Sequence, residues 1–370
     1  MPLFSNIKNK LIGLLWYLYP SLFVNRFIKK MKNEHIEIYG GYDAYPHIME
    51  NCGYFLKKEK LEDKLFMKKI IYDIVYSYFK YGTNANEYFC YNFPNRTSKE
   101  RNSYLPRKRK DELLINKMGK DWTKSFDQIK DKYCFYKIAK DFFKRDACEI
   151  SSISDLSSFT SFIHKHSKGI AKPSRGGCGA GIIIIDLEDF ENNIEKAFDY
   201  LLSFKIPFIL EEIVEQDPSM AEWNSSSLNT LRIPSFMTKN GHKIMYPSIR
   251  IGRAGSIVDN AGSGGTFAAI EPKTGKIISK GFDKRGNSFE KHPDSKKTYL
   301  NAEIPQWDEL LAFVSQLHKS MPKMHKYIAF DLALSTKGWV VIEANWGEMS
   351  MPQIEFGKGL YNEFSELIFN

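Results

Sequence analysis

The sequence predicts an α+β (α/β) protein in which most strands pair as antiparallel hairpins, preceded by a helical N-terminal region. Three observations predict this class. The first ninety residues show helical spacing of apolar side chains and no β-rich run. Short β-rich runs begin only after Lys168. Helical segments lie between some of these runs but do not alternate with every one, as a regular βαβ repeat requires.

Two helices are expected before residue 150. Leu61 to Lys80 places apolar residues three or four apart, and a second helix, rich in basic residues, is expected from Phe126 to Arg145. Between them, residues 94–112 are polar and basic and include Arg107-Lys-Arg-Lys110. This stretch could be a nucleic-acid patch or a solvated loop, and the lack of aromatic residues within the run from Arg107 to Lys110 favours the loop. We therefore expect no nucleic-acid partner.

The N-terminal segment contains the longest apolar run, Leu11 to Val24, which is interrupted by Pro20. This run is shorter than the roughly 18 to 20 residues that a membrane span needs. Basic residues flank it, so residues 8–30 could rest on an anionic membrane surface as an interfacial segment. A core helix broken at Pro20 is the interpretation we favour. The expected location is cytoplasmic, with contact at the inner face of the membrane as the alternative.

The composition narrows the class of protein without selecting a substrate. The chain has 370 residues and a formal net charge of +9, which favours anionic partners such as nucleotides. Its five cysteines form no CxxC pair, so neither a disulfide framework nor a cysteine zinc site is expected. His164 and His166 lie two residues apart, which could suit a metal on a strand. Solvated groups near a helix end are the interpretation we favour for them.

After Lys168 the chain alternates short strands with fewer helices. Helices are expected from Asp189 to Phe204 and from Trp307 to Met321. The expected strands are Gly181 to Asp186, Pro207 to Val214, Leu228 to Met237, Lys243 to Gly252 and Trp339 to Ala344.

The strongest functional pattern is Phe330-Asp331 followed twelve residues later by Glu343-Ala344-Asn345. Folding the two runs around a turn near Lys337 places Asp331 opposite Glu343. Asn345 then lies on the same face as Glu343, because side chains alternate along a strand. Carboxylate and amide oxygens are ligands that Mg2+ accepts. The alternative, two rim charges on an ordinary hairpin, is disfavoured by the apolar neighbours, because buried paired carboxylates without a cation are costly.

A glycine-rich loop follows a lysine in Ala171-Lys172-Pro173-Ser174-Arg175-Gly176-Gly177-Cys178-Gly179-Ala180-Gly181. Glycines let the backbone approach phosphate groups, and the basic side chains add positive charge. The loop is neither a Walker A loop nor a Rossmann fingerprint, because no GK[ST] closes it and a strand follows it. It could be a flexible flap over phosphates or a plain hairpin turn.

Three further patterns are weaker by themselves. The run Phe208-Ile-Leu-Glu211-Glu212-Ile213-Val214-Glu215-Gln216-Asp217 is an apolar strand ending in acids, which could read adenine and ribose or could be an exposed strand end. Arg232, on the expected strand with Thr230, could stabilise a transferring phosphoryl group or could be a surface residue. Val258 to Thr266, with Asn260, could be a second phosphate or substrate loop or a glycine-rich turn.

Together and in this order, these parts resemble the ATP-grasp superfamily. The sequence is similar in particular to the sugar-transfer-associated ATP-grasp group of bacterial capsule and exopolysaccharide gene clusters. That similarity spans roughly residues 85 to 360. Further segments that carry it are Asp131-Lys132, Phe142-Phe143-Lys144-Arg145, Ser227 to Ile233, and Val258-Asp-Asn260 with Gly264-Gly265. The helical first ninety residues depart from the Rossmann-like domain with which many such enzymes begin.

The resemblance implies an ATP-grasp fold, with two α+β lobes enclosing ATP. The implied regions are a helical region over 1–90, a first lobe with the flap over 91–210, and a second lobe with the magnesium site over 211–370. The implied cofactors are ATP and Mg2+. The implied nucleotide-binding residues are Lys132, Lys172, Ser174, Arg175, Gly176, Gly177, Gly179, Gly181, Glu211, Glu212, Ile213 and Val214, with Glu215 or Asp217 on the ribose and Gln216 as a further candidate. The implied metal ligands are Asp331, Glu343 and Asn345, and the implied catalytic residues are Arg232, Lys172 and Asn260.

The expected activity is ligation of a carboxylate to an amine through an acyl phosphate. The substrate would be a sugar carboxylate or an amino acid, in capsular or exopolysaccharide modification. One alternative is an ATP-dependent kinase of a sugar or another hydroxyl with the same fold. An alternative of a different class is a non-catalytic basic module that binds anionic glycan or nucleic acid.

Overall fold

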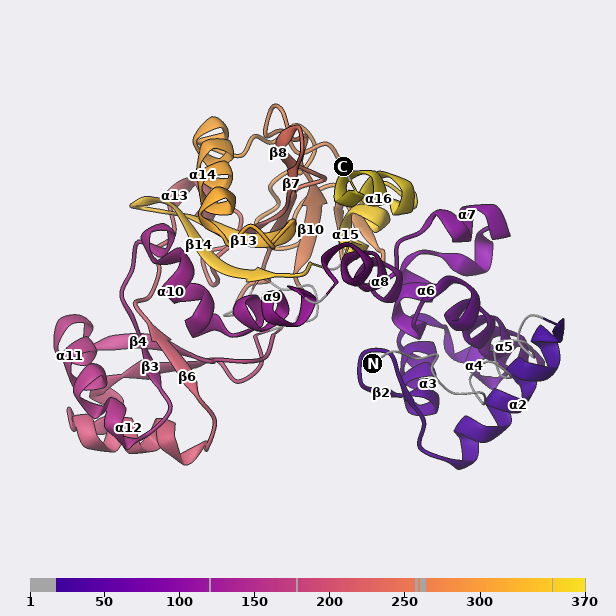
Figure 1. The fold of residues 1–370 in the computed structure, drawn as a ribbon, viewed down its shortest axis with the longest axis horizontal. Coiled ribbons are helices and arrows are strands. Elements are labelled where there is room, and N and C mark those ends of the chain that lie inside the picture. The colour runs from indigo at the N-terminus through magenta and orange to yellow at the C-terminus, as the bar shows by residue number, and fades with distance from the viewer. Residues whose placement is uncertain are drawn as a thin grey trace. The chain divides into compact units, whose positions relative to one another are not determined.

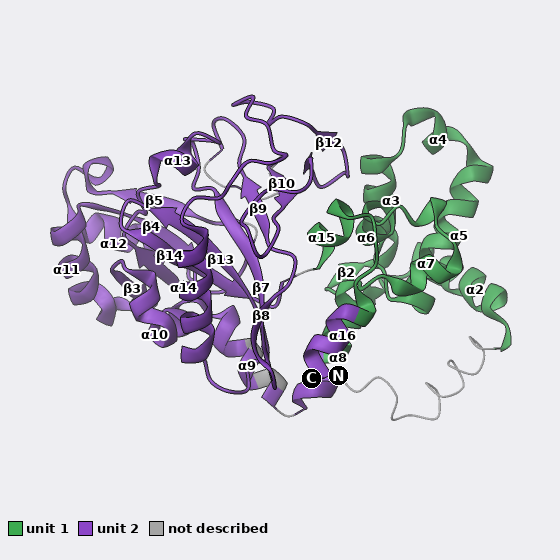
Figure 2. Ribbon diagram, turned by 90° about the horizontal axis from the view of Figure 1, so that it is seen from above, with its two compact units in different colours: residues 1–113, 348–362 green, residues 114–347, 363–370 purple. Residues whose placement is uncertain are grey.

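The computed structural model describes residues 18–119, 121–177, 179–256, 259, 264–347 and 349–369. The chain forms two compact units, which Figure 2 colours green and purple. Unit 1 contains Met1–Leu113 and Glu348–Asn362, and unit 2 contains Leu114–Gly347 and Glu363–Asn370. The mixed helix-and-sheet class and the helical N-terminal region are confirmed. The three-part division of the chain stays a prediction.

Unit 1 is built from helices and one short hairpin (Figure 1). Its elements are α2 (Pro20–Asn33), β1 (Glu37–Ile38), β2 (Tyr42–Asp43), α3 (Ala44–Phe55), α4 (Lys58–Glu62), α5 (Lys64–Tyr81), α6 (Ala85–Cys90), α7 (Ser98–Ser103), the first part of α8 (Arg107–Met118), and α15 (Ser350–Glu355). The predicted helix 61–80 is α5. It begins later than expected because the Asp63 carboxylate accepts hydrogen bonds from the first turn. It ends at Tyr81, and Gly82, with φ +78°, caps its C-terminus.

Helix α2 packs into the core of unit 1. It begins at Pro20, where proline is tolerated because its missing N–H would have no partner in the first turn. Val24 and Met31 are buried on its inner side, whereas Leu22 is 69% exposed. The part of the predicted apolar run before residue 18 lies outside the described residues. No helix within the described ranges is long and apolar enough to cross a bilayer.

The basic stretch 94–112 is not the solvated loop that we predicted. It contains α7 and the start of α8, and Lys110 is only 2% exposed. The Lys110 ammonium lies 3.2 Å from an Asp111 carboxylate oxygen, and the Arg109 guanidinium lies 3.9 Å from the centre of the Tyr361 ring. These side chains bury their long apolar stems and pair their charged ends, which a reading of charge alone does not anticipate.

A segment near the C-terminus completes unit 1. The Gln353 carbonyl oxygen accepts a hydrogen bond from the Leu105 N–H at 2.7 Å, and its amide nitrogen donates to the Leu105 carbonyl at 3.1 Å. The same amide nitrogen donates to the Tyr91 hydroxyl at 3.2 Å. One buried side chain therefore joins α15 to residues about 250 positions earlier, a contact that no local pattern predicts.

Unit 2 contains an eight-stranded sheet, with strand order β12-β11-β10-β9-β7-β13-β14 and β8 paired to β7. All pairs are antiparallel, as predicted. The strands are β7 (Thr230–Thr238), β8 (Gly241–Ile244), β9 (Ser248–Ile251), β10 (Thr266–Ala269), β11 (Gly281–Phe282), β12 (Ser288–Phe289), β13 (Tyr327–Ser335) and β14 (Gly338–Asn345). The run 243–252, predicted as one strand, is broken where Tyr246 has φ +48° and Pro247 lacks an N–H.

A four-stranded antiparallel sheet, in the order β3-β6-β4-β5, lies in the same unit. Its strands are β3 (Ala147–Ile150), β4 (Lys168–Pro173), β5 (Ile183–Asp186) and β6 (Phe208–Glu211). One face packs against α11 (Leu156–His166) and α12 (Ile194–Ser203) through a cluster that includes Phe159, Phe198 and Leu210 (Figure 1). The predicted helix 126–145 is two helices, α9 (Asp121–Lys130) and α10 (Lys132–Phe143), because Asp131 caps α10.

The two faces of the large sheet differ. On one face, the Ser235 hydroxyl of β7 bonds His318 of α14 (Trp307–Ser320) at 2.7 Å, so this helix covers that face. Phe236, the next residue along β7, points to the other face and packs against Phe364 of α16 (Tyr361–Phe369). Arg232 is an even number of residues from Phe236, so it shares this second face, where the predicted metal ligands also lie.

Candidate active site

The hairpin β13–β14 places Asp331 directly opposite Glu343, as the sequence predicts. This pairing does not follow from the turn alone but from the turn together with a β-bulge. Ser335 pairs with Gly338 around a tight turn, which by itself would put Asp331 opposite Ile342. A β-bulge between Asp331 and Leu332 adds one residue on β14 and restores the Asp331–Glu343 pair. Without it, Glu343 would point to the opposite face of the sheet.

Glu343 is the unpartnered acid of this site. Its carboxylate forms no hydrogen bond or ion pair within the described part of the chain, although the side chain is half-buried. Burial and the nearby Asp331 carboxylate raise the pKa of Glu343, while Lys132, Arg232 and Lys172 lower it. Two adjacent acids, one without a partner, fit a divalent cation, because a cation would relieve both desolvation and repulsion.

Asn345 lies on the same face, opposite Ala329. Its amide nitrogen is 3.4 Å from an Asp331 oxygen, and its carbonyl oxygen accepts the Gly347 N–H at 2.6 Å. A carbonyl oxygen has two lone pairs, so this oxygen could bind a metal in addition to the Gly347 N–H. The three predicted metal ligands are therefore brought together on one sheet face.

Two arginines border the acids. Arg232, directly across from Asp331, donates two hydrogen bonds to its carboxylate, one of them at 2.9 Å. Arg250, on β9, donates to Asp331 at 3.1 Å and to Asp259 at 3.0 Å. Burial raises the pKa of Asp259, although Arg250 and a bond from Thr230 oppose that rise. When all three acids are ionised, they and the two arginines carry one net negative charge, which favours the binding of a cation.

The sequence reasoning did not identify Arg250 as a site residue, and it included Asp259 only within the possible phosphate or substrate loop Val258 to Thr266. The position of Arg250 depends on the pairing of β9 with β7, which puts it opposite Thr230 on the face that carries Arg232. One sequence pattern could have drawn attention to Arg250: in the Ser-Ile-Arg-Ile run of β9, this charged residue lies between two buried isoleucines. That pattern alone does not distinguish a site residue from a surface arginine.

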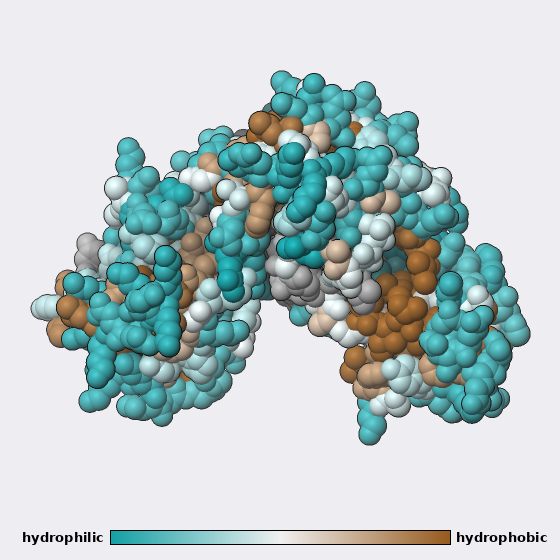
Figure 3. All heavy atoms as spheres, turned by 180° about the vertical axis from the view of Figure 1, so that it is seen from behind, coloured by the Kyte–Doolittle hydropathy of each residue, from teal (hydrophilic) through white to brown (hydrophobic). Residues whose placement is uncertain are grey.

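The face of the four-stranded sheet opposite to α11 and α12 carries Lys172 and Glu211. Strand pairing puts them on one face with Ile170 and Ile184, away from α11 and α12. Ile184 is 45% exposed. Figure 3 shows apolar atoms gathered in a hollow on the part of the molecule that holds this sheet. An exposed apolar surface beside a buried lysine fits a flat aromatic base that carries phosphates.

Glu211 accepts hydrogen bonds from two cations. Its Oε2 atom lies 2.5 Å from Arg145 Nη2 and 3.1 Å from Lys172 Nζ. Although burial opposes ionisation of Glu211, the two cations outweigh it and lower the pKa of this carboxyl. Burial and the Arg145 charge lower the pKa of Lys172, against the attraction of Glu211. The cluster carries a net charge of +1, which suits a phosphate.

The glycine-rich segment connects β4 to β5, so the predicted strand–loop–strand hairpin is confirmed. Lys132, at the start of α10, donates to the carbonyls of Pro173 and Gly176, both at 3.1 Å. The Ser174 hydroxyl is buried without a hydrogen-bond partner in the described structure. Gly176 and Gly181 have φ values of +135° and +72°, which side chains rarely allow, whereas Cys178 lies outside the described residues.

The remaining residues of this loop frame its open end. Arg175 is exposed and lies 3.5 Å from carboxylate oxygens of Asp127 and Asp131. An added Cβ at Gly177 would meet no atom within 4 Å, so this glycine has open space around it. Gly179 has φ +70°. A loop with exposed backbone at these positions can present its amide hydrogens to an anion.

The segment after β6 leaves peptide groups available. Among the described residues, the N–H groups of Ile213 and Val214 donate no hydrogen bond. The segment is held at both ends: the Glu212 N–H donates to the Asp146 carbonyl at 3.0 Å, and the Glu215 carbonyl accepts the Thr336 N–H at 3.1 Å. Free peptide groups in a rigid segment could read the edge of a base.

The three candidates for a ribose contact differ in availability. Gln216 uses both ends of its amide, donating to the Asn224 carbonyl and accepting from the Asn229 N–H. Asp217 caps α13 (Pro218–Ala221) through the Ser219 N–H at 2.9 Å. Glu215 is exposed and has one long contact, 3.4 Å, with the Thr336 hydroxyl. Glu215 is therefore the most available of the three.

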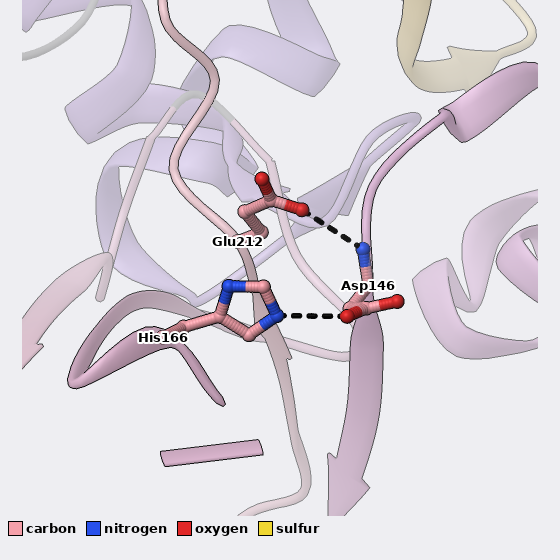
Figure 4. A group of neighbouring side chains, drawn as sticks. All are labelled: Asp146, His166 and Glu212. Carbon is pink, nitrogen blue, oxygen red and sulfur yellow. Dashed lines mark hydrogen bonds and ion pairs between the residues drawn. The ribbon is translucent and has the colours of Figure 1, made fainter. Parts of the chain in front are cut away.

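Figure 4 shows a separate cluster of Asp146, His166 and Glu212, whose potential metal-binding atoms lie within 4.8 Å of one another. His166, at the end of α11, is half-buried, and its Nε2 atom lies 2.7 Å from Asp146 Oδ2, so it is not the solvated group that we predicted. His164 is exposed near the end of the same helix, as predicted. Lys165 lies 2.5 Å from the same Asp146 oxygen, and Lys337 lies 3.0 Å from Glu212. Because these lysines already neutralise both acids, we interpret the cluster as an ion-pair network.

The structure thus brings most predicted site residues to two sheet faces of unit 2. Lys132, Lys172 and Glu211 belong to the smaller sheet or its edge, and Arg232, Asp331, Glu343 and Asn345 belong to the larger one. Arg145 donates hydrogen bonds to Glu211 of the smaller sheet and to the Val341 carbonyl of the larger one, so the two groups are close. Asn260 lies outside the described residues.

Comparison with known proteins identifies one family model, described as sugar-transfer associated ATP-grasp, which matches residues 120–367. No curated protein matches the chain.

Among solved structures, D-alanyl-alanine synthetase A from Vibrio cholerae is 14% identical, with 66% of this chain and 64% of that chain covered and a TM-score of 0.39. The ATP-grasp ligase PsnB, complexed with minimal precursor, Mg and ADP, is 11% identical, with 67% and 60% covered and a TM-score of 0.40. D-alanine–D-alanine ligase from Helicobacter pylori is 14% identical, with 65% and 60% covered and a TM-score of 0.39. The chain spans less than two thirds of the length of each of these proteins.

Proposed function

This chain belongs to the sugar-transfer associated ATP-grasp family, and we propose that it uses ATP and Mg2+, the cofactors of ATP-grasp enzymes, to join a carboxylate to an amine. The observation that carries this proposal is the unpartnered Glu343 carboxylate beside Asp331, on the same face as Asn345. Glu343 lies beside another carboxylate without a partner of its own, and a buried acid of this kind destabilises the fold unless a cation binds. Catalysis requires ligands that a rigid sheet holds in place.

In the proposed reaction, ATP supplies the γ-phosphoryl group. A carboxylate oxygen of the substrate attacks the γ-phosphorus, the bond to the β–γ bridging oxygen breaks, and ADP leaves. The amine nitrogen then attacks the acyl carbon and loses a proton, and inorganic phosphate leaves. Such transfer depends on positioning and charge neutralisation more than on covalent help from the protein. The site fits this demand, because it offers cations, amides and acids.

Each part of the site has a proposed role. Asp331, Glu343 and Asn345 would hold Mg2+. Lys132, Lys172 and the glycine-rich segment would neutralise the phosphates, and Arg232, joined by Arg250, would stabilise charge at the transferring phosphoryl group. Ile213 and Val214 would read adenine through their peptide groups. Glu215 would bind ribose, because its carboxylate is the most exposed of the three candidates and is not used as a helix cap.

The substrate is proposed to be a sugar carboxylate or an amino acid, and the product an amide-modified glycan of a capsule or exopolysaccharide. The family's association with sugar transfer and the net charge of +9 support an anionic sugar substrate. A kinase that phosphorylates a hydroxyl would need the same site. Product analysis separates the two reactions, because a kinase yields a stable phosphoester and ligation releases inorganic phosphate.

The first experiment is an ADP-release screen of uronic acids, amino acids and nucleotide sugars with amine donors, followed by mass spectrometry of the products. Asp331→Asn should abolish ADP release. Asp73→Asn is the matched control, since Asp73 also accepts two bonds from an arginine, Arg101, but lies in unit 1. Full ADP release by Asp331→Asn would refute the metal assignment. ADP release with a phosphoester product and no inorganic phosphate would refute ligation.

A further inference from the structure

Arg145 is a buried arginine for which the proposed reaction leaves no role. It lies between α10 and β3, and its side chain is 3% exposed. Its Nε and Nη2 atoms donate to Glu211 Oε2 at 2.8 and 2.5 Å. Its Nη1 atom donates to the carbonyls of Phe143 at 3.2 Å and Val341 at 2.6 Å. All three guanidinium nitrogens therefore donate hydrogen bonds, and their acceptors lie on β6, α10 and β14.

Two of the three acceptors of Arg145 belong to the two sheets that carry the site. Glu211 lies on β6 of the smaller sheet, where the same Oε2 atom accepts a bond from Lys172. Val341 lies on β14, at the end of the larger sheet's strand order, two residues before Glu343. Its carbonyl lies next to the bulge that restores the Asp331–Glu343 pair. One planar cation thus connects the strand pair of Lys172 to the strand of Glu343.

We propose that Arg145 is a positioning residue that sets the distance between the Lys172 ammonium and the Glu343 carboxylate. The inference rests on the proposed roles of Lys172 in phosphate binding and of Glu343 in Mg2+ binding. A triphosphate that bridges the lysine and the metal needs both at a defined separation. Arginine suits this task better than lysine, because its rigid guanidinium holds several acceptors in one plane at once.

The chain offers a matched control for a purely structural role. Arg101 in unit 1 also binds one carboxylate twice, at Asp73, and donates to two backbone carbonyls, those of Phe93 and Arg96. Loss of Arg145 or of Arg101 should therefore lower the melting temperature in a similar way. Only loss of Arg145 should change the binding of Mg-ATP.

The test measures Mg-ATP dissociation constants by isothermal titration calorimetry, without any carboxylate or amine substrate. Arg145→Met should weaken binding at least tenfold, and Arg101→Met less than twofold. Arg145→Lys keeps a cation beside Glu211 but cannot reach all the acceptors, so it should weaken binding by several-fold. This variant keeps the proposal testable if Arg145→Met does not fold.

A double-mutant comparison separates positioning from a general loss of structure. In a Lys172→Met background, Arg145→Met should change Mg-ATP affinity less than twofold, because no lysine remains to be positioned. An equal tenfold loss in both backgrounds would overturn the positioning role. Unchanged affinity in Arg145→Met would also overturn it, with the proposed function intact. If the wild-type protein binds no Mg-ATP, the proposed function itself fails, and this inference fails with it.

Discussion

Two buried histidines should make unit 2 sensitive to mild acid. His318 and His325 are 2% and 1% exposed, and burial lowers the pKa of each to about 4. His318 bonds the Ser235 hydroxyl and the His325 carbonyl, and His325 bonds Ser125 and Gln128. Burial keeps both rings in the neutral form, so unfolding at pH 5 must add a proton to each ring.

The sign and size of the effect follow from linkage. The folded pKa values lie below the unfolded value of about 6.5, so the unfolded chain binds more protons and stability rises with pH. The contribution is fully present above pH 6.5 and is lost as the pH falls toward 4. Between pH 7.5 and pH 5.0 the expected loss is roughly 2 kcal/mol per histidine, or about 4 kcal/mol for the pair.

The assay is urea unfolding followed by tryptophan fluorescence at several pH values between 5.0 and 7.5. The double variant His318→Gln/His325→Gln should be less stable than the wild type at pH 7.5, because glutamine fills the space of each ring less completely and forms weaker hydrogen bonds there. Between pH 7.5 and pH 5.0, however, the double variant should lose about 4 kcal/mol less of its free energy of unfolding than the wild type loses. His35→Gln is the control, since His35 is exposed in unit 1. An equally steep loss in the double variant and the wild type would refute the reasoning.

Three further outcomes are expected. Glu343→Gln should raise the free energy of unfolding by roughly 1 kcal/mol in the absence of Mg2+, because it removes an unpartnered acid beside Asp331. The same variant should bind Mg2+ more weakly. A lower melting temperature than that of the wild type in the presence of a chelator would contradict this prediction. Gln353→Met should lower the free energy of unfolding by roughly 2 to 4 kcal/mol, because it leaves the Leu105 N–H and carbonyl without hydrogen-bond partners. Urea unfolding measures this loss. A change below about 1 kcal/mol would argue against the buried link. Gly281→Val should destabilise unit 2 by more than about 2 kcal/mol, since an added Cβ would lie 2.3 Å from the Tyr299 ring; a wild-type melting temperature would exclude that packing.

Patterns with a short reach along the chain predicted much of the fold. The apolar spacing of α5 identified that helix. The hairpin that turns near Lys337 and the hairpin that contains the glycine-rich loop formed where expected. These features depend on residues within about twenty positions of one another. Where local chemistry was overlooked, the prediction failed locally, as at Asp131, whose side chain caps a new helix within the segment predicted as one.

Sequence alone therefore located several strands of the β-rich half and brought Asp331 near Glu343, because side-chain alternation and hairpin formation act between near neighbours. The β-bulge that sets their exact pairing appears only in the structure. Only the tertiary structure brought Arg250 to Asp331, buried Lys110 within a basic run and placed Arg145 between two sheets. The Gln353–Leu105 link belongs to the same group. Most of these contacts join segments that approach one another only when the whole unit packs. The burial of Lys110 depends instead on its long apolar stem, which a pattern of charges does not reveal. Local periodicity carries no information about such distances, so the residues that complete this site emerge only when the sheets are assembled.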